Sequence, residues 1–468
     1  MMAVPPQAGA YRAEPTILGL GDAFYDPVSA ANFPQATLRF RNERWATAVG
    51  LDTLSDADWV RHFGRFEPLP ANLPQPLALR YHGHQFRSYN PDIGDGRGFL
   101  FAQLRDGAGR LLDLGTKGSG RTPYSRSGDG RLTLKGGVRE VLATEMLEAL
   151  GVETSKSFSL IETGEALERG DEPSPTRSAV LVRLQHSHIR IGTFQRLAYL
   201  DDKEAITRLT DYCLTHYFGE EDGSDPGGRL LTHAVRSGAR LAAAYVAAGF
   251  VHGVLNTDNI AITCQSFDYG PWRWTPYWDN AFTAAYFDHA GLYAFGRQPE
   301  AIHWNLVQLA ASLRLIAEAE TLTAALEIFP DAFQDALAES LFARLGIVPK
   351  GNARDAKLLI AIETALAAKT VEIDRFFFDW RGGTRRAASP ADAHYDGGDF
   401  AGVRQAIRGY EAASAAGHEY WSDPAPCSMH IDEVEAIWSA IDEADDWSLF
   451  YAKVAAVRRM GDAMRARA

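Results

Sequence analysis

A polar stretch at residues 251–262 constrains the fold and function of this chain more than any other segment. Apolar and small residues at helical spacing lead into it, and Gly249 is expected to end that helix. Asp258 and Asn259 then fall within one short loop, and an apolar alternation follows, which we interpret as a hairpin. Asp268 comes next, on a turn that contains glycine. Asn and Asp in this order suit a bound metal ion, but the same residue types also cap ordinary turns, so both interpretations stay open at this point.

A glycine-rich loop and two predicted strands lie upstream of this stretch. Residues 94–98 have the sequence Gly-Asp-Gly-Arg-Gly, and residues 99–105 and 111–117 alternate in the manner of strands joined by a turn. Backbone N–H groups of such a loop can approach phosphate oxygens. The motif alone is weak evidence, because glycine-rich turns are common, but Asp95 and Arg97 are unusual in a plain turn.

A long basic loop follows the second strand. Residues 118–137 are rich in Gly, Ser, Thr and Pro, and Asp129 and Gly130 lie inside the segment. The cations of the loop, together with the Lys that ends the strand, are Lys117, Arg121, Arg126, Arg131 and Lys135. Turn residues separate these side chains, which do not lie along one helical face, so we predict an anion pocket in preference to a solvated surface.

The next elements supply a carboxylate and two further cations. Residues 137–150 predict an amphipathic helix that places Glu140 near its buried face, where it is either a surface side chain or the partner of Lys117. Strands are predicted at 156–162 and 178–184. The second strand carries Arg183, and Arg190 follows seven residues later.

The order of these elements predicts an α+β fold of the protein-kinase-like, two-lobed type, with a small β-rich lobe that has one key helix and a larger, mainly helical lobe. The expected segments are an N-terminal extension at 1–78, a nucleotide-binding small lobe at 79–195, a helical lobe with the catalytic loop at 196–380, and a C-terminal helical extension at 381–468. Helices of the last two segments are expected at 203–218, 231–248, 302–318, 332–345, 352–369, 402–416 and 431–444. We also expect an irregular arm at 1–35, short helices within 37–65, and a loop at 381–400.

The composition indicates a globular protein without nucleic-acid or membrane partners. The chain has 468 residues, enough for more than one core, of which 46% are hydrophobic and 23% charged. The net charge of −13 argues against general nucleic-acid binding, so any anion site must be a local cluster of Arg and Lys. Three cysteines without a CxxC pair indicate a reducing, cytoplasmic location. No secretory leader or membrane span is expected, and we expect a monomer.

Several short motifs occur in a fixed order between about residue 80 and residue 315. They are Gly83-His84-Gln85-Phe86, Gly94-Asp95-Gly96-Arg97, the segments 117–126 and 128–131, Val138-Arg139-Glu140, Ser187-His188-Ile189-Arg190, the loop 252–259, Asp268-Tyr269-Gly270-Pro271, and Gln298 with Trp304-Asn305-Leu306. In these motifs and their order the chain resembles the selenoprotein O family, also called the SelO or YdiU family, of pseudokinase-like enzymes that AMPylate proteins.

The resemblance implies a chemistry and a set of site residues. ATP would bind in an orientation reversed relative to ordinary kinases, and AMP would pass to a Ser, Thr or Tyr hydroxyl of a protein. Asp258 would act as the base, and Asn259 and Asp268 would hold Mg²⁺, with Mn²⁺ as an alternative metal. Lys117 paired with Glu140 would hold phosphate. The remaining residues expected to bind the nucleotide, together with Asp268, are Gly94, Gly96, Arg97, Asp129, Gly130, Arg183 and Arg190.

The chain also departs from what such a site usually contains. Val254 stands two residues after His252, where a kinase catalytic loop carries Asp, which argues against ordinary phosphotransfer. The segment 426–430 stands in place of the family's Arg-Asn-His motif, and the chain ends without the Cys or selenocysteine pair of many members, so redox control through that pair is not expected. Two alternatives remain: a kinase that transfers the γ-phosphate, and a non-catalytic nucleotide-binding scaffold.

Overall fold

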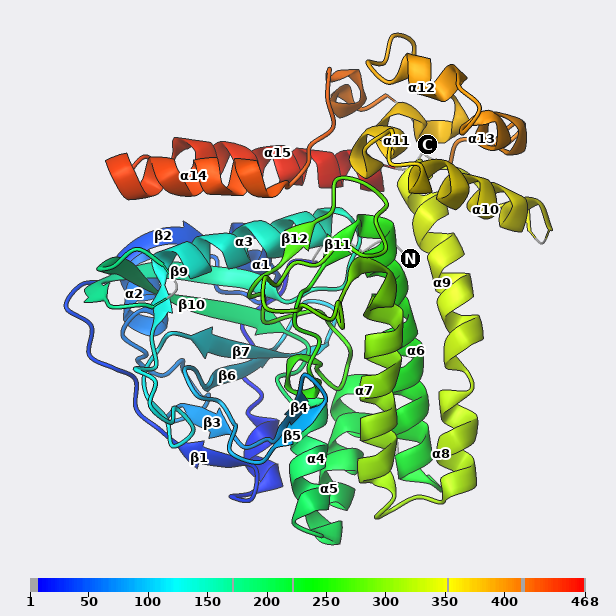
Figure 1. Ribbon diagram of the computed structural model, residues 1–468. Helices are drawn as coiled ribbons and strands as arrows, with labels where there is room; N and C mark the ends of the chain where they lie inside the picture. Colours follow the sequence, from blue (N-terminus) through cyan, green and yellow to red (C-terminus); the bar gives the residue numbers. More distant parts are fainter. Residues whose placement is uncertain (1–6, 171, 221–222, 352, 414–416, 467–468) are drawn as a thin grey trace.

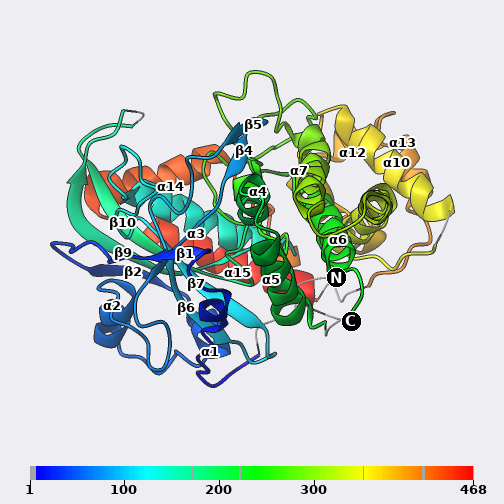
Figure 2. The same ribbon diagram turned by 90° about the horizontal axis from the view of Figure 1, so that it is seen from below.

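A computed structural model describes residues 7–170, 172–220, 223–351, 353–413 and 417–466 of the chain and shows a mixed α/β architecture (Figure 1). A curled antiparallel sheet forms one part of the molecule, and a group of long helices forms the other. Seen from below, α4 (Ile191–Tyr199) and α5 (Lys203–Cys213) lie between the sheet and the long helices (Figure 2). No helix among the described residues has the length and apolar character needed to cross a bilayer.

The main sheet has the strand order β1-β3-β6-β7-β10-β9-β2, and β8 pairs with β10. Its strands are β1 (Tyr25–Pro27), β2 (Thr37–Arg41), β3 (Leu77–Leu79), β6 (Leu100–Arg105), β7 (Leu111–Lys117), β8 (Leu132–Thr133), β9 (Lys156–Leu167) and β10 (Thr176–Gln185). The four strands predicted between residues 99 and 184 are confirmed as β6, β7, β9 and β10.

The N-terminal prediction needs two corrections, because residues 25–27 and 37–41 are strands and not parts of an irregular arm or a helical segment. β1 pairs with β3 at one edge of the sheet, and β2 pairs with β9 at the other. Both strands are too short to show a clear period of two, so long-range pairing decides their structure.

The two faces of the sheet carry different cores because side chains alternate along each strand. Val180 and Val182 of β10 pack in the core that contains Trp59 of α2 (Asp56–Phe63); α1 (Glu43–Ala48) contributes to the same core. Leu181 points the other way, into the core of α3 (Leu134–Ala149). Arg183, two residues after Leu181, therefore faces the α3 side, where Glu140 lies.

The long helices pack around α6 (Pro226–Ala248), which is buried along most of its length. Its neighbours include α7 (Gln298–Leu313), α8 (Ala319–Leu326) and α9 (Phe329–Leu345). The helices predicted in this region are confirmed, although α6 and α7 begin several residues earlier than expected, each with proline in its first turn. The sequence periodicity did not predict α4 or α8. Two small two-stranded sheets are also present: the hairpin of β4 (Gly83–Gln85) with β5 (Ser88–Asn90), and β11 (Phe250–Val251) paired with the distant β12 (Arg273–Trp274).

The C-terminal part contains α10 (Ala353–Ala367), α11 (Ile373–Asp379), α12 (Asp392–Asp396), α13 (Ala401–Ala406), α14 (Ile431–Ala444) and α15 (Ser448–Arg465). The helix predicted at 431–444 is confirmed as α14. The helix predicted at 402–416 is wrong for residues 407–413, because the chain turns after residue 406 and Gly409 adopts a left-handed conformation with φ of 78°. Residues 414–416 of that prediction lie outside the described residues. The predicted loop at 381–400 contains the short helix α12, and α15 was not predicted. α14 and α15 lie along the outer side of α3 (Figure 1).

Candidate functional site

A cavity of about 720 Å³ collects most of the predicted site residues from seven separate segments of the chain. Those that line it are Gly94, Gly96, Arg97, Lys117, Asp129, Gly130, Arg183, Arg190, Asp258 and Asp268. Glu140 and Asn259 do not line it. Glu140 lies behind Lys117, and Asn259 is the neighbour of a lining residue.

The cavity wall carries seven cationic side chains against five carboxylates. The whole chain has a net charge of −13, so this excess of positive charge is local. Guanidinium groups bind phosphate oxygens in pairs through their planar fork, and clustered cations inside a cavity attract polyanions. The wall is therefore suited to a ligand that carries several negative charges.

Lys117 and Glu140 form a buried ion pair next to the cavity. The Lys117 Nζ atom lies 2.6 Å from Glu140 Oε2 and 2.8 Å from Asp268 Oδ1. β7 delivers Lys117 from the sheet, and α3 delivers Glu140, whose side chain is fully buried. Because a buried charge needs a close partner, the pair fixes the Lys117 ammonium group at the cavity wall.

Arg183 and Arg190 converge on the same carboxylate. Their Nη1 atoms lie 3.3 Å and 3.5 Å from the two oxygens of Asp268. Burial by itself would raise the pKa of Asp268, but the cations of Lys117, Arg183 and Arg190 hold that pKa well below its usual range. Asp268 is therefore an anion at every physiological pH, held in a left-handed backbone conformation with φ of 63°.

Arg190 also ties the glycine loop to the polar stretch. Its guanidinium donates to the backbone oxygen of Asp258 at 2.6 Å and to Asp95 Oδ1 at 3.2 Å, and it lies over the ring of Tyr81. Asp95 in turn accepts a hydrogen bond from the Leu79 N–H at 3.0 Å. Asp95 was not predicted as a site residue, although a carboxylate inside a glycine loop was the available signal.

Asp258 is the group in the cavity best placed to take up a proton. Burial raises the pKa of Asp258 to about 6, while Arg190 opposes the rise and Asp268 adds to it. Its Oδ1 atom is buried and has no hydrogen-bond partner among the described residues. A carboxylate with a pKa near neutrality and an unused lone pair is suited to general-base chemistry.

Side chains from distant segments hold the loop around Asp258 in place. Gln298 of α7 accepts from the His252 N–H at 3.0 Å and donates to the Phe250 oxygen at 2.8 Å, and Asn305 donates to the Leu255 oxygen at 2.8 Å. From the other side, the β4–β5 hairpin donates the His84 N–H to Thr257 Oγ1 at 2.7 Å and the Phe86 N–H to Asn256 Oδ1 at 3.0 Å. The Gln298, Asn305 and Gly83–Phe86 motifs therefore have a structural role, which is to hold the loop around Asp258 in place.

Replacing Gln298 by Leu is expected to destabilise the protein. The substitution leaves two buried backbone groups, the His252 N–H and the Phe250 carbonyl, without their partner, at a cost of about 2 to 4 kcal/mol in the free energy of unfolding. Denaturant unfolding measures this loss. Gln308→Leu, the same change on the more exposed part of α7, is the control and is expected to change stability little. Equal stability of the two variants would contradict the bracing role of Gln298.

The basic loop divides between the cavity and other surfaces. Arg126 and Arg131 line the cavity together with Lys117, as predicted, whereas Arg121 lines a separate hollow and Lys135 lies 2.7 Å from Glu435 of α14. The prediction that all five cations form one pocket is therefore wrong for two of them.

Arg169 was missed by the sequence reasoning. It lines the cavity and binds Asp129 with an Nη1–Oδ2 distance of 2.8 Å. Burial would raise the pKa of Asp129, but the hydrogen bonds from Arg169 and from the Arg131 backbone leave it below its usual value. A single Arg on a turn between two strands gives no sequence signal of such a role.

The hairpin predicted between Asn259 and Asp268 is wrong. Ala261 pairs with Arg190 in an isolated bridge, and Ser266 pairs with Thr154 in another. The apolar residues of this segment are instead buried against other parts of the chain. These two bridges hold Asp258 and Asp268 at the same cavity although ten residues separate them.

The residues that could hold a metal ion are few. Among the described residues, no group of three or more His, Cys, Asp or Glu side chains is arranged for metal binding. Asp258 and Asp268 both line the cavity, and the Oδ1 atom of Asp258 is buried without a hydrogen-bond partner among the described residues. Asn259 donates its Nδ2 to the Val254 oxygen at 3.1 Å, which assigns its amide oxygen as the acceptor. Mg²⁺ usually takes only one or two protein ligands beside phosphate oxygens and water, so this sparse set of oxygens fits it.

Comparison with known proteins gives a family match over most of the chain. The sequence matches the family model described as protein adenylyltransferase SelO over residues 9–395. A protein of Gloeobacter violaceus named protein nucleotidyltransferase YdiU is 43% identical over 95% of both chains. Proteins of the same name are 51% identical in Synechocystis sp., over 71% of this chain and 70% of that one, and 41% identical in Trichormus variabilis, over 96% of both chains.

Proposed function

The chain belongs to the SelO family of protein adenylyltransferases, and from this premise we propose that it transfers AMP from ATP to Ser, Thr or Tyr hydroxyl groups of proteins. The observation that carries the proposal is the convergence of Lys117, Arg183 and Arg190 on Asp268 at the wall of one cavity. A triphosphate is a ligand that such a cluster of cations suits.

The same cavity suggests how ATP is held. Lys117, Arg183 and Arg190 bind phosphate oxygens, and the glycine loop with Arg97 and the turn at Asp129 and Gly130 line the rest of the nucleotide. As part of the proposal, ATP lies in the orientation reversed from that of ordinary kinases, so that its α-phosphate faces Asp258. The kinase-like, two-lobed description belongs to the proposal as well, with the sheet and α3 as the small lobe.

The reaction needs one proton transfer and one displacement. The acceptor hydroxyl gives its proton to Asp258, and its oxygen forms a bond to the α-phosphorus of ATP. The bond between that phosphorus and the bridging oxygen to the β-phosphate breaks, and pyrophosphate leaves with the electron pair. Negative charge grows on the leaving pyrophosphate, and the cations of the wall stabilise it. Arg190 binds the backbone of Asp258 and so fixes the position of the base relative to the cations that bind phosphate.

We propose that Asn259 and Asp268 hold Mg²⁺, with Mn²⁺ as an alternative metal. Such a cation, when bound, neutralises phosphate charge and orients the triphosphate. Asp268, which Lys117 and the two arginines now neutralise, would be free to hold such a cation if these side chains bound ATP oxygens instead. The cytoplasmic location, the monomeric state and the four segment boundaries expected from the sequence remain predictions.

Mass spectrometry of proteins incubated with ATP and Mg²⁺ tests the proposed function. We expect AMP attached through a phosphodiester to Ser, Thr or Tyr of the enzyme itself or of proteins in a lysate, and no such adducts with the Asp258→Asn variant. Phosphate adducts without AMP would identify a kinase, and the absence of any adduct over repeated lysates would favour a nucleotide-binding scaffold.

A further inference from the structure

The C-terminal helices α14 and α15 contact the helix that carries Glu140. α3 lies between the sheet and this helix pair (Figure 1). The family match ends at residue 395, so both helices lie beyond it. No residue of α14 or α15 lines the cavity. These helices also contact the sheet, where Arg177 of β10 donates to the Ile441 oxygen at 2.9 Å and Tyr451 donates to the Arg39 oxygen of β2 at 2.8 Å. Their contact with α3 is the one that reaches the helix of Glu140 directly.

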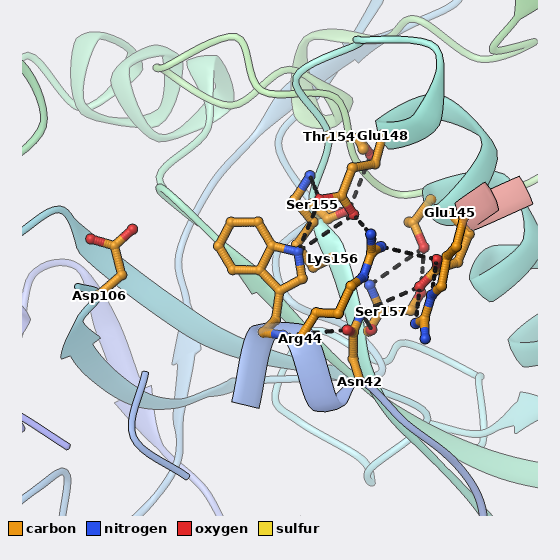
Figure 3. Close-up of polar contacts among 12 residues, drawn as sticks. Asn42, Arg44, Asp106, Glu145, Glu148, Thr154, Ser155, Lys156 and Ser157 are labelled. Atoms are coloured by element: carbon orange, nitrogen blue, oxygen red, sulfur yellow. Dashed lines mark hydrogen bonds and ion pairs between the residues drawn. The ribbon is translucent and has the colours of Figure 1, made fainter. Parts of the chain in front are cut away.

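α3 carries two further buried carboxylates beyond Glu140. Glu145 and Glu148 are 2% and 6% exposed, and basic and amide side chains surround them (Figure 3). Arg44 lies 3.2 Å from Glu145 and 3.4 Å from Glu148, and Lys156 lies 3.5 Å from Glu148. Burial would raise the pKa of Glu148, but Lys156 and Arg44 hold it below its usual value.

Arg458 of α15 makes the strongest of these contacts. Its Nε and Nη2 atoms donate to the two oxygens of Glu145 at 2.8 Å and 2.7 Å, a bidentate pair. Bidentate pairs with a carboxylate fix orientation as well as distance. Because Glu145 is buried, loss of Arg458 removes the one bidentate partner of a desolvated charge.

A second contact holds the other end of α3. Lys135 in the first turn of α3 lies 2.7 Å from Glu435 of α14. Near the C-terminal end, Gly461 of α15 approaches Ala149 so closely that an added Cβ atom would lie 3.1 Å from the Ala149 Cα. α14 and α15 are joined to each other by Lys453 and Glu433, 2.6 Å apart. The helix pair therefore contacts α3 near both of its ends.

We propose that Arg458 is a positioning residue for the adenylyl transfer and that it acts through Glu145 and α3 on the Lys117–Glu140 pair. Glu145 is five residues after Glu140, which places it about 140° around the helix axis. A rotation or outward shift of α3 that separates Glu140 from Lys117 would also break the bidentate pair with Arg458. The C-terminal helices thus hold the arrangement in which Lys117 points at phosphate. This inference rests on the proposed function for its kinetic readout only.

The test compares two neighbouring arginines of α15. Arg458→Met removes the contact with Glu145. Arg459→Met is the matched control, because Arg459 binds Asp423 at 2.7 Å and 3.0 Å and Glu419 at 3.0 Å, and has no hydrogen bond or ion pair with α3 among the described residues. We expect Arg458→Met to lower kcat for AMP transfer by about tenfold and to raise the rate of amide hydrogen exchange of residues 134–149. The control is expected to change neither. Arg458→Lys, which keeps the charge without the bidentate geometry, is expected to lose less activity and guards against misfolding of the Met variant.

A double-mutant cycle separates positioning from a general loss of stability. In a Glu140→Gln background the Lys117 contact is already weakened, so adding Arg458→Met is expected to change kcat by less than about twofold. Equal losses in the two backgrounds would overturn the proposal, as would unchanged hydrogen exchange of α3 in Arg458→Met. If the wild-type protein transfers no AMP, the proposed function fails, whereas hydrogen exchange of α3 and ATP binding still decide whether Arg458 positions this helix.

Discussion

Replacing Lys117 with Met is expected to lower the rate of AMP transfer by about 10²- to 10³-fold, the loss typical of removing one electrostatic contact to the transition state. Lys117 lies between Glu140 and Asp268 and is the only lysine among the cavity-lining residues of the described chain. Without its ammonium group, the one cationic partner left to Glu140 among the described residues is Arg183, at 3.5 Å. Steady-state kinetics with ATP and an acceptor protein measures the loss.

The control for this variant is Lys350→Met. Lys350 lies outside the cavity, 3.9 Å from the exposed Glu411, and surface pairs of this kind contribute little. We expect wild-type kinetics from it. A Lys117→Met protein that is folded and keeps more than half of the wild-type kcat/KM would contradict the assignment of Lys117 to phosphate binding.

Replacing Asp258 with Asn is expected to have opposite effects on activity and stability. AMP transfer should fall by about 10²- to 10⁴-fold, because the base that accepts the hydroxyl proton is lost. The unliganded protein should become more stable at neutral pH by about 2 to 3 kcal/mol, because a pKa raised by burial to about 6 means that the carboxylate destabilises the folded state. Kinetics and thermal unfolding measure the two effects.

The pH dependence follows from the same group. The folded-state pKa of Asp258 lies above its ordinary value, so its contribution to stability is present at low pH and is lost as pH rises through about 6. The wild-type kcat/KM should rise over the same range, because only the carboxylate accepts a proton. Both pH effects should be absent from Asp258→Asn. Asp396→Asn, which removes an exposed carboxylate paired with Arg385, should retain them. A fall in Tm for Asp258→Asn at pH 7 would contradict the account of this residue.

The regular elements that surround the site could be predicted from local patterns. β7 has the predicted bounds, and α14 likewise, because alternation and helical spacing are properties of the segment itself. β1 and β2 could not be predicted, since they are strands only through pairing with β3 and β9. α15 was missed for a related reason: it is amphipathic, but its buried face is defined by α3, which is about 300 residues away in the sequence.

The residues of the candidate site, like the elements of the fold, could be predicted from the sequence only in part. The order of motifs indicated Lys117, Asp258 and Asp268, and the structure places all three at one cavity. Spacing alone could not decide which cations of a flexible-looking loop face that cavity. Lys135, for example, turns outward to Glu435, and Arg169 arrives from a turn with no motif. Which side chains meet in a loop-built cavity depends on how distant loops pack, and a local pattern does not contain that information.

Incubation with ATP labelled either at the α-phosphate or at the γ-phosphate tests the central claim most directly, namely that the cations of this cavity hold a triphosphate whose α-phosphorus is attacked. With Mg²⁺ present, we predict that label from α-labelled ATP stays on protein after free nucleotide is removed, and that label from γ-labelled ATP leaves as pyrophosphate. We predict that the Lys117→Met variant retains neither label on protein. Retention of the γ-label alone would contradict the account.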